Sequence, residues 1–388
     1  MSDYLMDTYA RLPVAFARGE GAWLWDEDGK RYLDATAGLG VCALGHAHPV
    51  VAKAICEQAG TLIHTANLAR VPWQEKLAEK LCRVAGMDRA FICNSGTEAI
   101  ECAFKICRLK ARDRGIDAPE VVVMEDSFHG RTMAALSATG SRKVQSGFEP
   151  LVSGFVRVPY GDIEAMKEIA GSRPHVVAVL LEPIQGESGV RVPPPGYLRA
   201  LRELCDGQGW LLVCDEIQTG LARTGNWFAC QHEEVRPDLM TSAKALANGV
   251  PIGACMGSGE AAEAFTPGRH GSTFGGNPLA CRTACTVLDL MEELRLPERA
   301  NRLGQFIMAE FQAKLKGNDA IVDIRGRGLM IGIEVDREVN DLKTAALEKG
   351  LLMNVTHDNV VRLLPPLIID DEQAALIVET VSGLLNSL

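Results

Sequence analysis

The chain has 388 residues, which is enough for a large α/β unit and one smaller domain. Its 40 Lys and Arg residues against 50 Asp and Glu give a net charge of -10, so nucleic acid would be repelled and is not an expected partner. No stretch reaches ~18 uninterrupted apolar residues, and we therefore expect no membrane-spanning helix.

The apolar pattern predicts helices that alternate with strands in the first two thirds of the chain. A helical period places Leu77, Leu81 and Val84 on one face of a helix over 75–84. Short apolar runs typical of buried strands follow at 121–124, 176–181 and 210–214. This alternation favours an α/β fold with a mostly parallel sheet covered on both faces.

The pattern changes after Leu279. A long helical stretch to about Leu315 precedes a β-like segment around 320–335 and a closing helix at 371–386. We interpret this part as a smaller α+β domain. The expected division is an amino-terminal segment that packs with the small domain, a large domain and the small carboxy-terminal domain, over residues 1–50, 51–275 and 276–388.

Polar and ionisable side chains gather where the predicted strands end. In open parallel sheets, ligands bind outside the carboxyl ends of the strands. The segments that follow the strands are 94–98, 126–131, 182–187 and 215–218. The sequence therefore predicts a ligand site at this edge of the sheet.

The segment 94–98 predicts the start of a helix. Ser95 and Glu98 have the spacing of a capping box, and Gly96 would let an anion approach backbone N–H groups at the positive end of the helix dipole. Taken alone, the pattern fits a phosphate site and an ordinary capped helix equally well.

Two ionisable residues are expected to be buried. Asp215 closes the strand 210–214, and a buried carboxylate requires a donor or a cation, for which either a protonated pyridine nitrogen or a following turn would serve. Lys244 lies among small and apolar residues in 241–246, where loss of water lowers an amine pKa and favours Schiff-base chemistry. A lone lysine is more often solvated surface.

The order of these features resembles that of the class III, ornithine-type pyridoxal-phosphate aminotransferases. The resemblance runs from about Tyr9 to the carboxy terminus, and it includes a segment rich in glycine and hydroxyl groups at 270–278. The matching stretches are 45–49, 94–99, 128–132, 182–187, 214–220, 223–225, 242–245 and 271–278. The resemblance implies a fold-type I homodimer with its active sites at the subunit interface.

The resemblance also implies pyridoxal 5'-phosphate as cofactor. Lys244 would carry the cofactor and move a proton between substrate and cofactor, while Asp215 would keep the pyridine nitrogen protonated. Phe128 would stack on the ring, Gln218 would lie near the phenolic oxygen, and Thr273 would reach the phosphate in the neighbouring subunit. The residues implied to bind the cofactor are Ser95, Gly96, Thr97, Phe128, Asp215, Ile217, Gln218, Lys244 and Thr273.

The stretch 127–132 is similar to that of acetylornithine aminotransferases. There, the arginine that matches Arg131 grips the α-carboxylate of the acetylated substrate, and the serine that matches Ser272 also contacts it. Ornithine δ-aminotransferases commonly have tryptophan at the position of His129 and tyrosine at that of Leu39. Since a bidentate arginine clamp suits any carboxylate, Arg131 alone does not separate the two.

Glu187 and Arg362 form a second pair that the resemblance implies. Arg362 would bind the α-carboxylate of glutamate or 2-oxoglutarate, and Glu187 would neutralise it when an ω-amine occupies the site. The alternative is a structural ion pair. Cys42 departs from the family, which frequently has asparagine there, and this weakens the substrate assignment.

We therefore expect transfer of the terminal amino group of N2-acetylornithine to 2-oxoglutarate, a step of arginine biosynthesis. Succinylornithine, ornithine, 4-aminobutyrate and succinyl-diaminopimelate are alternative amino donors. An NAD(P) oxidoreductase is disfavoured because the clustered glycines do not fit G-x-G-x-x-G. A non-catalytic homologue is disfavoured by the retained Lys244 and Asp215, whereas an aminomutase or a racemase would use the same two residues.

The twelve cysteines lie mostly among apolar neighbours, and none forms a C-x-x-C pair. This favours free thiols in a reducing compartment over disulfides or a metal site. The amino terminus lacks the basic and apolar pattern of a leader, so we expect a cytoplasmic enzyme. Structural roles are expected for His46 and His48, and the role of His129 stays open.

Overall fold

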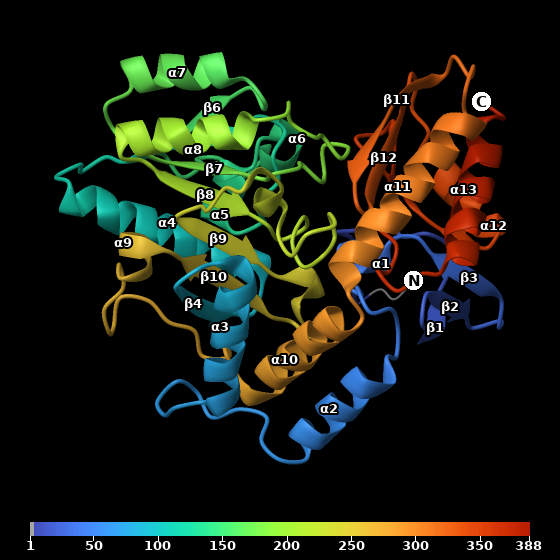
Figure 1. Cartoon of the computed structure of the whole chain (residues 1–388), viewed down its shortest axis with the longest axis horizontal. Coiled ribbons are helices and arrows are strands. Elements are labelled where there is room, and N and C mark those ends of the chain that lie inside the picture. Colours follow the sequence, from blue (N-terminus) through green and yellow to red (C-terminus); the bar gives the residue numbers. More distant parts are fainter. Residues whose placement is uncertain (1–3) are drawn as a thin grey trace.

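A seven-stranded sheet forms the centre of the computed structural model, which describes residues 4–388 (Figure 1). Its strand order is β4-β10-β9-β8-β7-β5-β6. Only β10 runs antiparallel to its neighbours, so the expected mostly parallel sheet is confirmed. The strands are β4 (Arg89–Cys93), β5 (Glu120–Met124), β6 (Phe155–Val158), β7 (Val176–Leu181), β8 (Leu211–Asp215), β9 (Leu239–Ser242) and β10 (Gly253–Gly257).

Both faces of this sheet are buried, which explains why its strands are continuously apolar. Along β5, Val121 and Val123 belong to one hydrophobic cluster, and Val122 and Met124 belong to the other. One cluster includes residues of α4 (Gly96–Asp113), α5 (Met133–Ala138) and α9 (Gly259–Ala262). The opposite cluster includes residues of α3 (Pro72–Ala85), α8 (Tyr197–Gln208) and α10 (Pro278–Glu293).

The predicted strands and the predicted helix at 75–84 are present with small shifts. Strand β8 begins and ends one residue later than expected, so Asp215 is its last residue. Helix α3 extends beyond the predicted segment on both sides. The other elements of this part are α1 (Ala37–Gly40), α2 (Pro49–Ala59), α6 (Arg142–Gln145), α7 (Ile163–Ser172) and the short 3-10 helices η1 (Ala229–Glu233) and η2 (Lys244–Ala247).

Two four-stranded sheets lie beside the central one, one of which joins the two ends of the chain. In it, β3 pairs in parallel with β13, and the Leu33 N–H donates to the Gly350 carbonyl at 2.8 Å. The sheets contain β1 (Phe16–Glu20), β2 (Trp23–Asp26), β3 (Arg31–Asp34) and β13 (Leu351–Leu352) in one, and β11 (Ile321–Arg327), β12 (Met330–Val335), β15 (Val360–Leu363) and β14 (Asn354–Thr356) in the other.

The long helical stretch expected from Leu279 to Leu315 is two helices, α10 and α11 (Leu296–Lys314). Arg295 between them has a left-handed φ of 51°, which ends one helix, and Pro297 fits the first turn of the next because no N–H is needed there. The β-like segment at 320–335 is the hairpin of β11 and β12. The closing helix is α13 (Asp371–Leu385), preceded by α12 (Leu342–Glu348).

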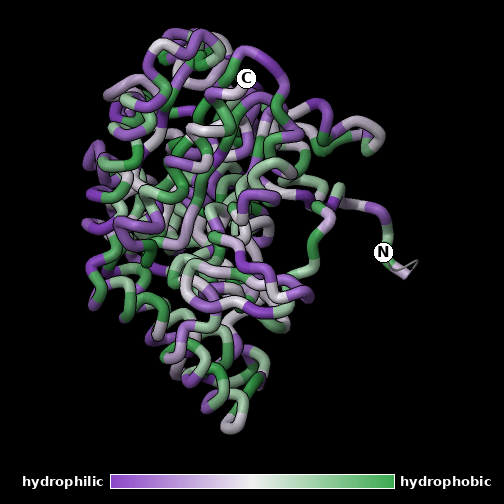
Figure 2. The backbone as a smooth tube through the Cα atoms, turned by 90° about the vertical axis from the view of Figure 1, so that its right-hand side faces the viewer, coloured by the Kyte–Doolittle hydropathy of each residue, from purple (hydrophilic) through white to green (hydrophobic). Residues whose placement is uncertain are grey.

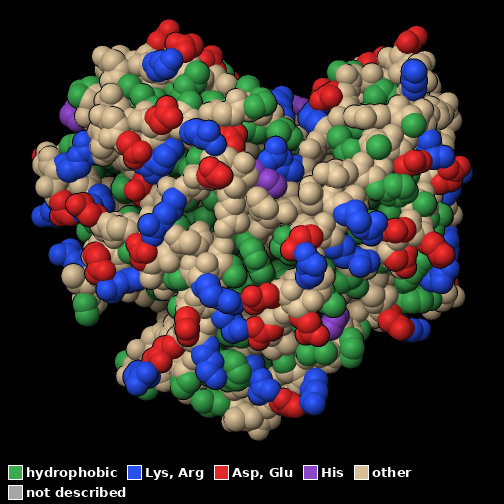
Figure 3. Space-filling model, viewed as in Figure 1, with side chains coloured by type: hydrophobic (Ala, Val, Ile, Leu, Met, Phe, Trp, Pro, Cys, Tyr) green, Lys and Arg blue, Asp and Glu red, His purple; other side chains and the backbone are tan. Residues whose placement is uncertain are grey.

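The surface carries charges of both signs, interspersed on the face seen in Figure 3. That face is hollowed between the lobe that holds α7 and α8 and the lobe that holds α11 and α13 (Figures 1 and 3). The segment before β1 extends away from the body of the molecule (Figure 2). None of the described helices is long and apolar enough to cross a membrane.

Candidate active site

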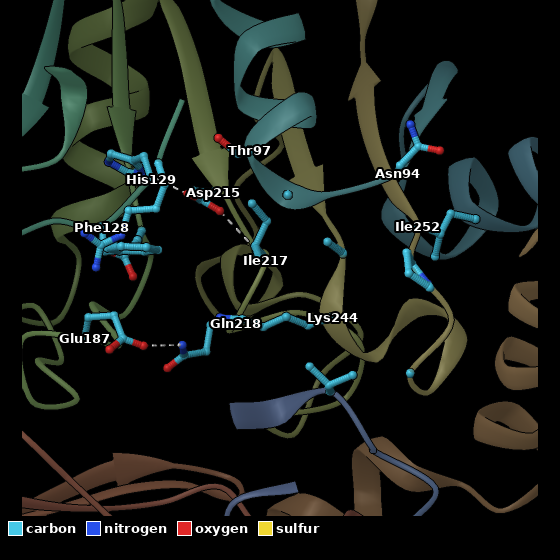
Figure 4. A pocket seen from close by; sticks show the side chains of 18 of the residues that line it. Asn94, Thr97, Phe128, His129, Glu187, Asp215, Ile217, Gln218, Lys244 and Ile252 are labelled. Atoms are coloured by element: carbon cyan, nitrogen blue, oxygen red, sulfur yellow. Dashed lines mark hydrogen bonds and ion pairs between the residues drawn. The ribbon is translucent and has the colours of Figure 1, made fainter. Parts of the chain in front are cut away.

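A cavity of about 390 Å³ lies where five strands of the central sheet end (Figure 4). Its walls come from segments that follow β4, β5, β7, β8 and β9, whose parallel carboxyl ends meet at one edge. It brings together nine residues that the sequence singled out: Gly96, Thr97, Phe128, Arg131, Glu187, Asp215, Ile217, Gln218 and Lys244.

The amino end of α4 faces this cavity. Ser95 caps the helix, with its Oγ accepting from the Glu98 N–H at 3.3 Å, as the spacing predicted. The Glu98 carboxylate, however, accepts from the Asn94 N–H at 2.6 Å instead of closing a capping box. Within the described chain, the N–H groups of Gly96 and Thr97 have no acceptor, so a helix of 18 residues offers them to an anion.

Gly96 is required there by a close approach. A Cβ on Gly96 would lie 2.7 Å from Cδ1 of Ile217, which also lines the cavity. The absence of a side chain therefore keeps the backbone of the helix end accessible.

Asp215 is buried at the end of β8, with an exposed fraction of 3%. Its Oδ1 accepts from the Thr241 hydroxyl at 3.1 Å and from the Ile217 N–H at 3.2 Å. Nδ1 of His129 lies 2.7 Å from Oδ2. Because an ionised carboxylate only accepts, this short contact assigns the proton to Nδ1. Three contacts thus hold the Asp215 carboxylate in place inside the protein.

Lys244 follows β9 and begins the 3-10 helix η2. Its φ of 46° is rarely adopted by lysine and costs of order 1–3 kcal/mol, a strain that is often found at functional sites. Burial lowers the pKa of its amine, although Glu187 and Asp215 act in the opposite direction. A larger share of neutral, nucleophilic amine results.

Glu182 is a further buried carboxylate at the carboxyl end of β7. Its Oε1 accepts from the Phe128 N–H at 2.9 Å, and its Oε2 accepts from the Gly186 N–H at 3.0 Å. Burial raises its pKa to about 7, with His129 lowering it and Asp215 raising it further. Glu182 therefore fixes two pocket-lining loops with a carboxyl group that titrates near neutrality.

Arg362 and Glu187 form an ion pair with Nη1 and Oε1 2.7 Å apart. Nη1 of Arg362 also donates to the Gly186 carbonyl at 3.0 Å and to Oε1 of Gln218 at 3.2 Å. Burial works to raise the pKa of Glu187, but Arg362 and Lys244 bring it below its ordinary value. Arg362 is 1% exposed, and its Nε and Nη2 have no partner among the described residues. The buried Arg362 guanidinium thus has N–H groups on Nε and Nη2 that can bind a further carboxylate.

Arg131 lies at the exposed side of the cavity, with its guanidinium carbon 5.5 Å from the centroid of the Phe128 ring. No ion pair of Arg131 is present in the described part of the chain. It is therefore available to an anionic ligand.

Four of the singled-out residues do not line the cavity. Arg362 is paired with Glu187, which lines the cavity, and Ser95 acts as the helix cap. Ser272 accepts from Nδ2 of Asn94 at 3.2 Å, and Thr273 beside it is exposed. That Ser272 contacts the substrate and that Thr273 reaches the phosphate of a second subunit stay predictions.

The sequence left three polar residues of the pocket without a role, namely His129, Glu182 and Asn94. His129 has its partner 86 residues away, so nothing near it in the sequence signals the contact. Glu182 carried a usable signal, because it ends the apolar strand 176–181 just as Asp215 ends its own. Asn94 also lines the cavity.

The chain matches the family model Aminotransferase class-III over residues 4–385. It belongs to the class III aminotransferases, which are pyridoxal-phosphate enzymes, as the sequence predicted.

Among its relatives, an acetylornithine aminotransferase of Nitrosomonas europaea is 54% identical, over 99% of this chain and 98% of that protein. The crystal structure of acetylornithine aminotransferase from Elizabethkingia anophelis is similar with a TM-score of 0.90 and 37% identity, over 99% and 96% of the two chains. An ornithine aminotransferase of Toxoplasma gondii, in which partial occupancy of pyridoxal phosphate was seen, has a TM-score of 0.95 and 38% identity, over 99% and 92%.

The residues of the cavity fit pyridoxal phosphate. The unpartnered N–H groups at the start of α4 suit its phosphate, and the buried Asp215 suits a protonated ring nitrogen. Lys244 supplies an amine whose pKa burial lowers. A volume of about 390 Å³ is in the range of small-molecule sites.

Proposed function

We propose that this enzyme moves the terminal amino group of N2-acetylornithine to 2-oxoglutarate by a ping-pong reaction, which gives N-acetylglutamate semialdehyde and glutamate in arginine biosynthesis. The observation that carries the proposal is the convergence of Lys244, Asp215 and the α4 amino end in one cavity, with Arg131 at its exposed side. The extent of identity to the Nitrosomonas relative supports the choice of donor.

Lys244 and Asp215 carry the proposed chemistry. Bound pyridoxal phosphate supplies a carbonyl that bonds to amines and a ring that withdraws electrons from the reacting carbon. Lys244 would hold the cofactor when no substrate is present, and its lowered pKa would let the released amine take a proton from the substrate carbon and pass it to the cofactor. The Asp215 carboxylate would favour the protonated ring nitrogen, and His129 keeps Asp215 oriented.

The two arginines explain how one cavity could serve two substrates of different length. Arg131 binds the α-carboxylate of the acetylated donor, whose reacting amine is at the other end of the chain. Glutamate reacts at its α-amine, so its α-carboxylate must be bound nearer to Lys244, by Arg362. For this, Glu187 leaves Arg362, and it returns when the ω-amine donor binds.

We also propose a homodimer with shared active sites. Large apolar side chains are exposed next to the loop of Thr273, namely Leu62, Ile63, Leu68 and Phe274. Thr273 is exposed and does not line the cavity of its own chain, which supports a contact with the phosphate in the other subunit. The domain division at about 50 and 275 and a cytoplasmic location stay part of the proposal.

The choice of donor is tested by the kcat/KM of the purified holoenzyme with single amines and 2-oxoglutarate. We expect acetylornithine or another N2-acylated ornithine to exceed ornithine and 4-aminobutyrate by at least about tenfold. The unacylated α-amine of ornithine brings a positive charge beside Arg131, and 4-aminobutyrate has a shorter chain between its amine and its carboxylate. A higher value for ornithine or 4-aminobutyrate would contradict the choice of donor and leave the chemistry intact. Transfer without a keto-acid acceptor would instead indicate a mutase or racemase.

The shared sites are tested by mixing two inactive variants after reversible dissociation. Lys244→Ala removes the amine, and Thr273→Asp adds a negative charge that repels the phosphate. If sites are shared, a hybrid dimer contains one site with both natural residues, so that mixing restores activity. A mixture that exchanges subunits but stays inactive contradicts shared sites.

A further inference from the structure

A second cavity, of about 340 Å³, adjoins the candidate active site on the outer side of Arg131. The two cavities share Phe128, Arg131 and Glu187 in their walls. A molecule that reacts at Lys244 can therefore extend past Arg131 into the outer cavity without leaving the protein surface.

The position of Arg131 decides which part of a donor enters the outer cavity. On the proposed function, the reacting amine lies near Lys244 and the α-carboxylate lies on Arg131. The acylated nitrogen is bonded to the same carbon as that carboxylate, so the acyl group must lie next to Arg131. The outer cavity is the space that adjoins Arg131 on the side away from Lys244.

Two of the acidic residues of the outer cavity are already neutralised. Oδ2 of Asp126 lies 2.8 Å from Nη1 of Arg191, and Oε1 of Glu187 lies 2.7 Å from Nη1 of Arg362. Neither carboxylate requires a further cation, and the guanidinium of Arg131 has no counter-ion in the described structure. The inner wall of the cavity therefore favours anionic and neutral groups over cationic ones.

The rim holds a third acidic residue, Asp358, in the turn between β14 and β15. Asp358 is fixed without help from lysine, since Nδ2 of Asn340 donates to its Oδ1 at 3.0 Å and its carbonyl accepts from the Val339 N–H at 2.9 Å. Nζ of Lys143, from α6, forms only a long ion pair with Oδ2, at 3.9 Å and without a hydrogen bond. Lys143 is thus a cation at the rim whose side chain, 87% exposed, can turn toward a ligand.

We propose that the outer cavity receives the N-acyl group of the donor and that Lys143 is a specificity-determining residue, which raises the preference for acyl groups that end in a carboxylate. Succinyl has such a carboxylate at its far end, and acetyl has none. The carboxylate of a succinylated donor gains an ion pair with Lys143 that an acetylated donor cannot form. This proposal rests on the proposed function, because it requires N2-acylated amines to be donors.

The test is the ratio of kcat/KM for N2-succinylornithine to that for N2-acetylornithine, measured with the holoenzyme and 2-oxoglutarate. Lys143→Met removes the charge and should lower this ratio about threefold, which is the range of an exposed ion pair. Lys143→Glu should lower it about tenfold or more, because repulsion replaces attraction. The control Lys316→Met removes a lysine that is exposed after α11 and lines neither cavity, and it should leave the ratio unchanged.

Two outcomes overturn the proposal. If both Lys143 variants keep the ratio of the natural enzyme, because kcat/KM is unchanged or falls equally for the succinylated and the acetylated donor, Lys143 does not determine the preference for the acyl group. If the natural enzyme uses neither acylated amine but accepts another donor, the proposed function fails as well, and this is seen before any variant is made. Glutamate as donor gives an internal reference, since it has no acyl group.

Discussion

Asp215 is a buried carboxylate that His129, the Thr241 hydroxyl and the Ile217 N–H hold in one orientation. Asp215→Asn retains the shape of the side chain and removes the charge that favours a protonated ring nitrogen. We predict a loss of at least about a hundredfold in the rate of the half-reaction with glutamate, comparable to the removal of other charge-stabilising groups. Stopped-flow absorbance measures this rate. The surface variant Asp289→Asn should react normally; equal rates for all three proteins would contradict the role of Asp215.

Glu182 makes the stability of the cofactor-free protein depend on pH. Its folded pKa of about 7 lies above the ordinary value of 4.5, so the folded state binds the proton more tightly. The resulting stabilisation is complete below about pH 4.5 and is lost as the pH rises through 7, at about 1.4 kcal/mol for each unit of pKa difference.

Glu182→Gln removes this titration and keeps the shape. We predict that the melting temperature of the natural protein decreases, relative to that of the variant, as the pH rises from 5 to 8. This range follows from the ordinary and the folded pKa of Glu182. Differential scanning calorimetry measures both proteins. If the melting temperature of the natural protein minus that of the variant is constant, or increases with pH, the pKa of Glu182 is not raised.

At the residue scale, local sequence could predict the burial of Asp215 but not its partner. An aspartate at the end of an apolar strand must be enclosed, whereas the contact with His129 depends on the sheet order that places β8 two strands from β5. The strained backbone of Lys244 could not be predicted from the sequence either, because its φ of 46° is required only by the conformation of the folded loop.

The close approach of β10 to the start of α4 determines the shape of the proposed phosphate site, which the N–H groups of Gly96 and Thr97 form. A Cβ on Gly253 would lie 2.3 Å from the Ser95 carbonyl oxygen, which is backbone and cannot move aside alone. We predict that Gly253→Ala destabilises the protein by about 1–3 kcal/mol and weakens the binding of pyridoxal phosphate.

Urea unfolding and fluorescence titration with the cofactor measure the two effects. The control is Gly383→Ala in α13, where a Cβ meets nothing within 4 Å and should stabilise the helix by about 0.5–1 kcal/mol. Unchanged cofactor affinity in Gly253→Ala would mean that the close approach does not determine the shape of the site.

Elements with strong periodicity could be predicted, and those set by distant contacts could not. The strands β5, β7 and β8 are continuous apolar runs, but β10 has two glycines among its five residues and gives no clear signal. Its antiparallel position between β4 and β9 follows from packing alone. The break between α10 and α11, in contrast, carried a usable signal, because Pro297 inside the helical pattern marks the first turn of a new helix.

A buried arginine, Arg223, joins the central sheet to the carboxy-terminal hairpin and contributes to the stability of the whole molecule. Nη1 of Arg223 donates to the carbonyls of Leu329 at 3.0 Å and Pro365 at 2.6 Å. The side chain is fully buried. Removal of the guanidinium leaves both carbonyls without a donor, and each buried carbonyl without a donor costs about 1–3 kcal/mol of stability.

We therefore predict that Arg223→Met lowers the free energy of unfolding by about 2–5 kcal/mol. Arg112→Met, at an exposed position of α4, is the matched control and should stay within about 0.5 kcal/mol of the natural protein. Urea unfolding followed by circular dichroism measures both. A small loss in Arg223→Met would show that water replaces the guanidinium.

At the scale of the molecule, the sequence predicted an α/β fold with a smaller α+β part, and the three sheets agree with it. It could not predict the outer cavity, whose walls come from α6 and from a turn more than 200 residues later in the chain. Such a cavity exists only once the elements have packed.

The central claim is that Lys244 holds pyridoxal phosphate. Borohydride reduction of the holoenzyme makes the bond between cofactor and lysine permanent, and mass spectrometry of the peptides then identifies the modified lysine. We expect the cofactor on Lys244 and no modified lysine in Lys244→Ala. A protein saturated with pyridoxal phosphate that carries it on another lysine, or on none, would show that Lys244 does not hold the cofactor.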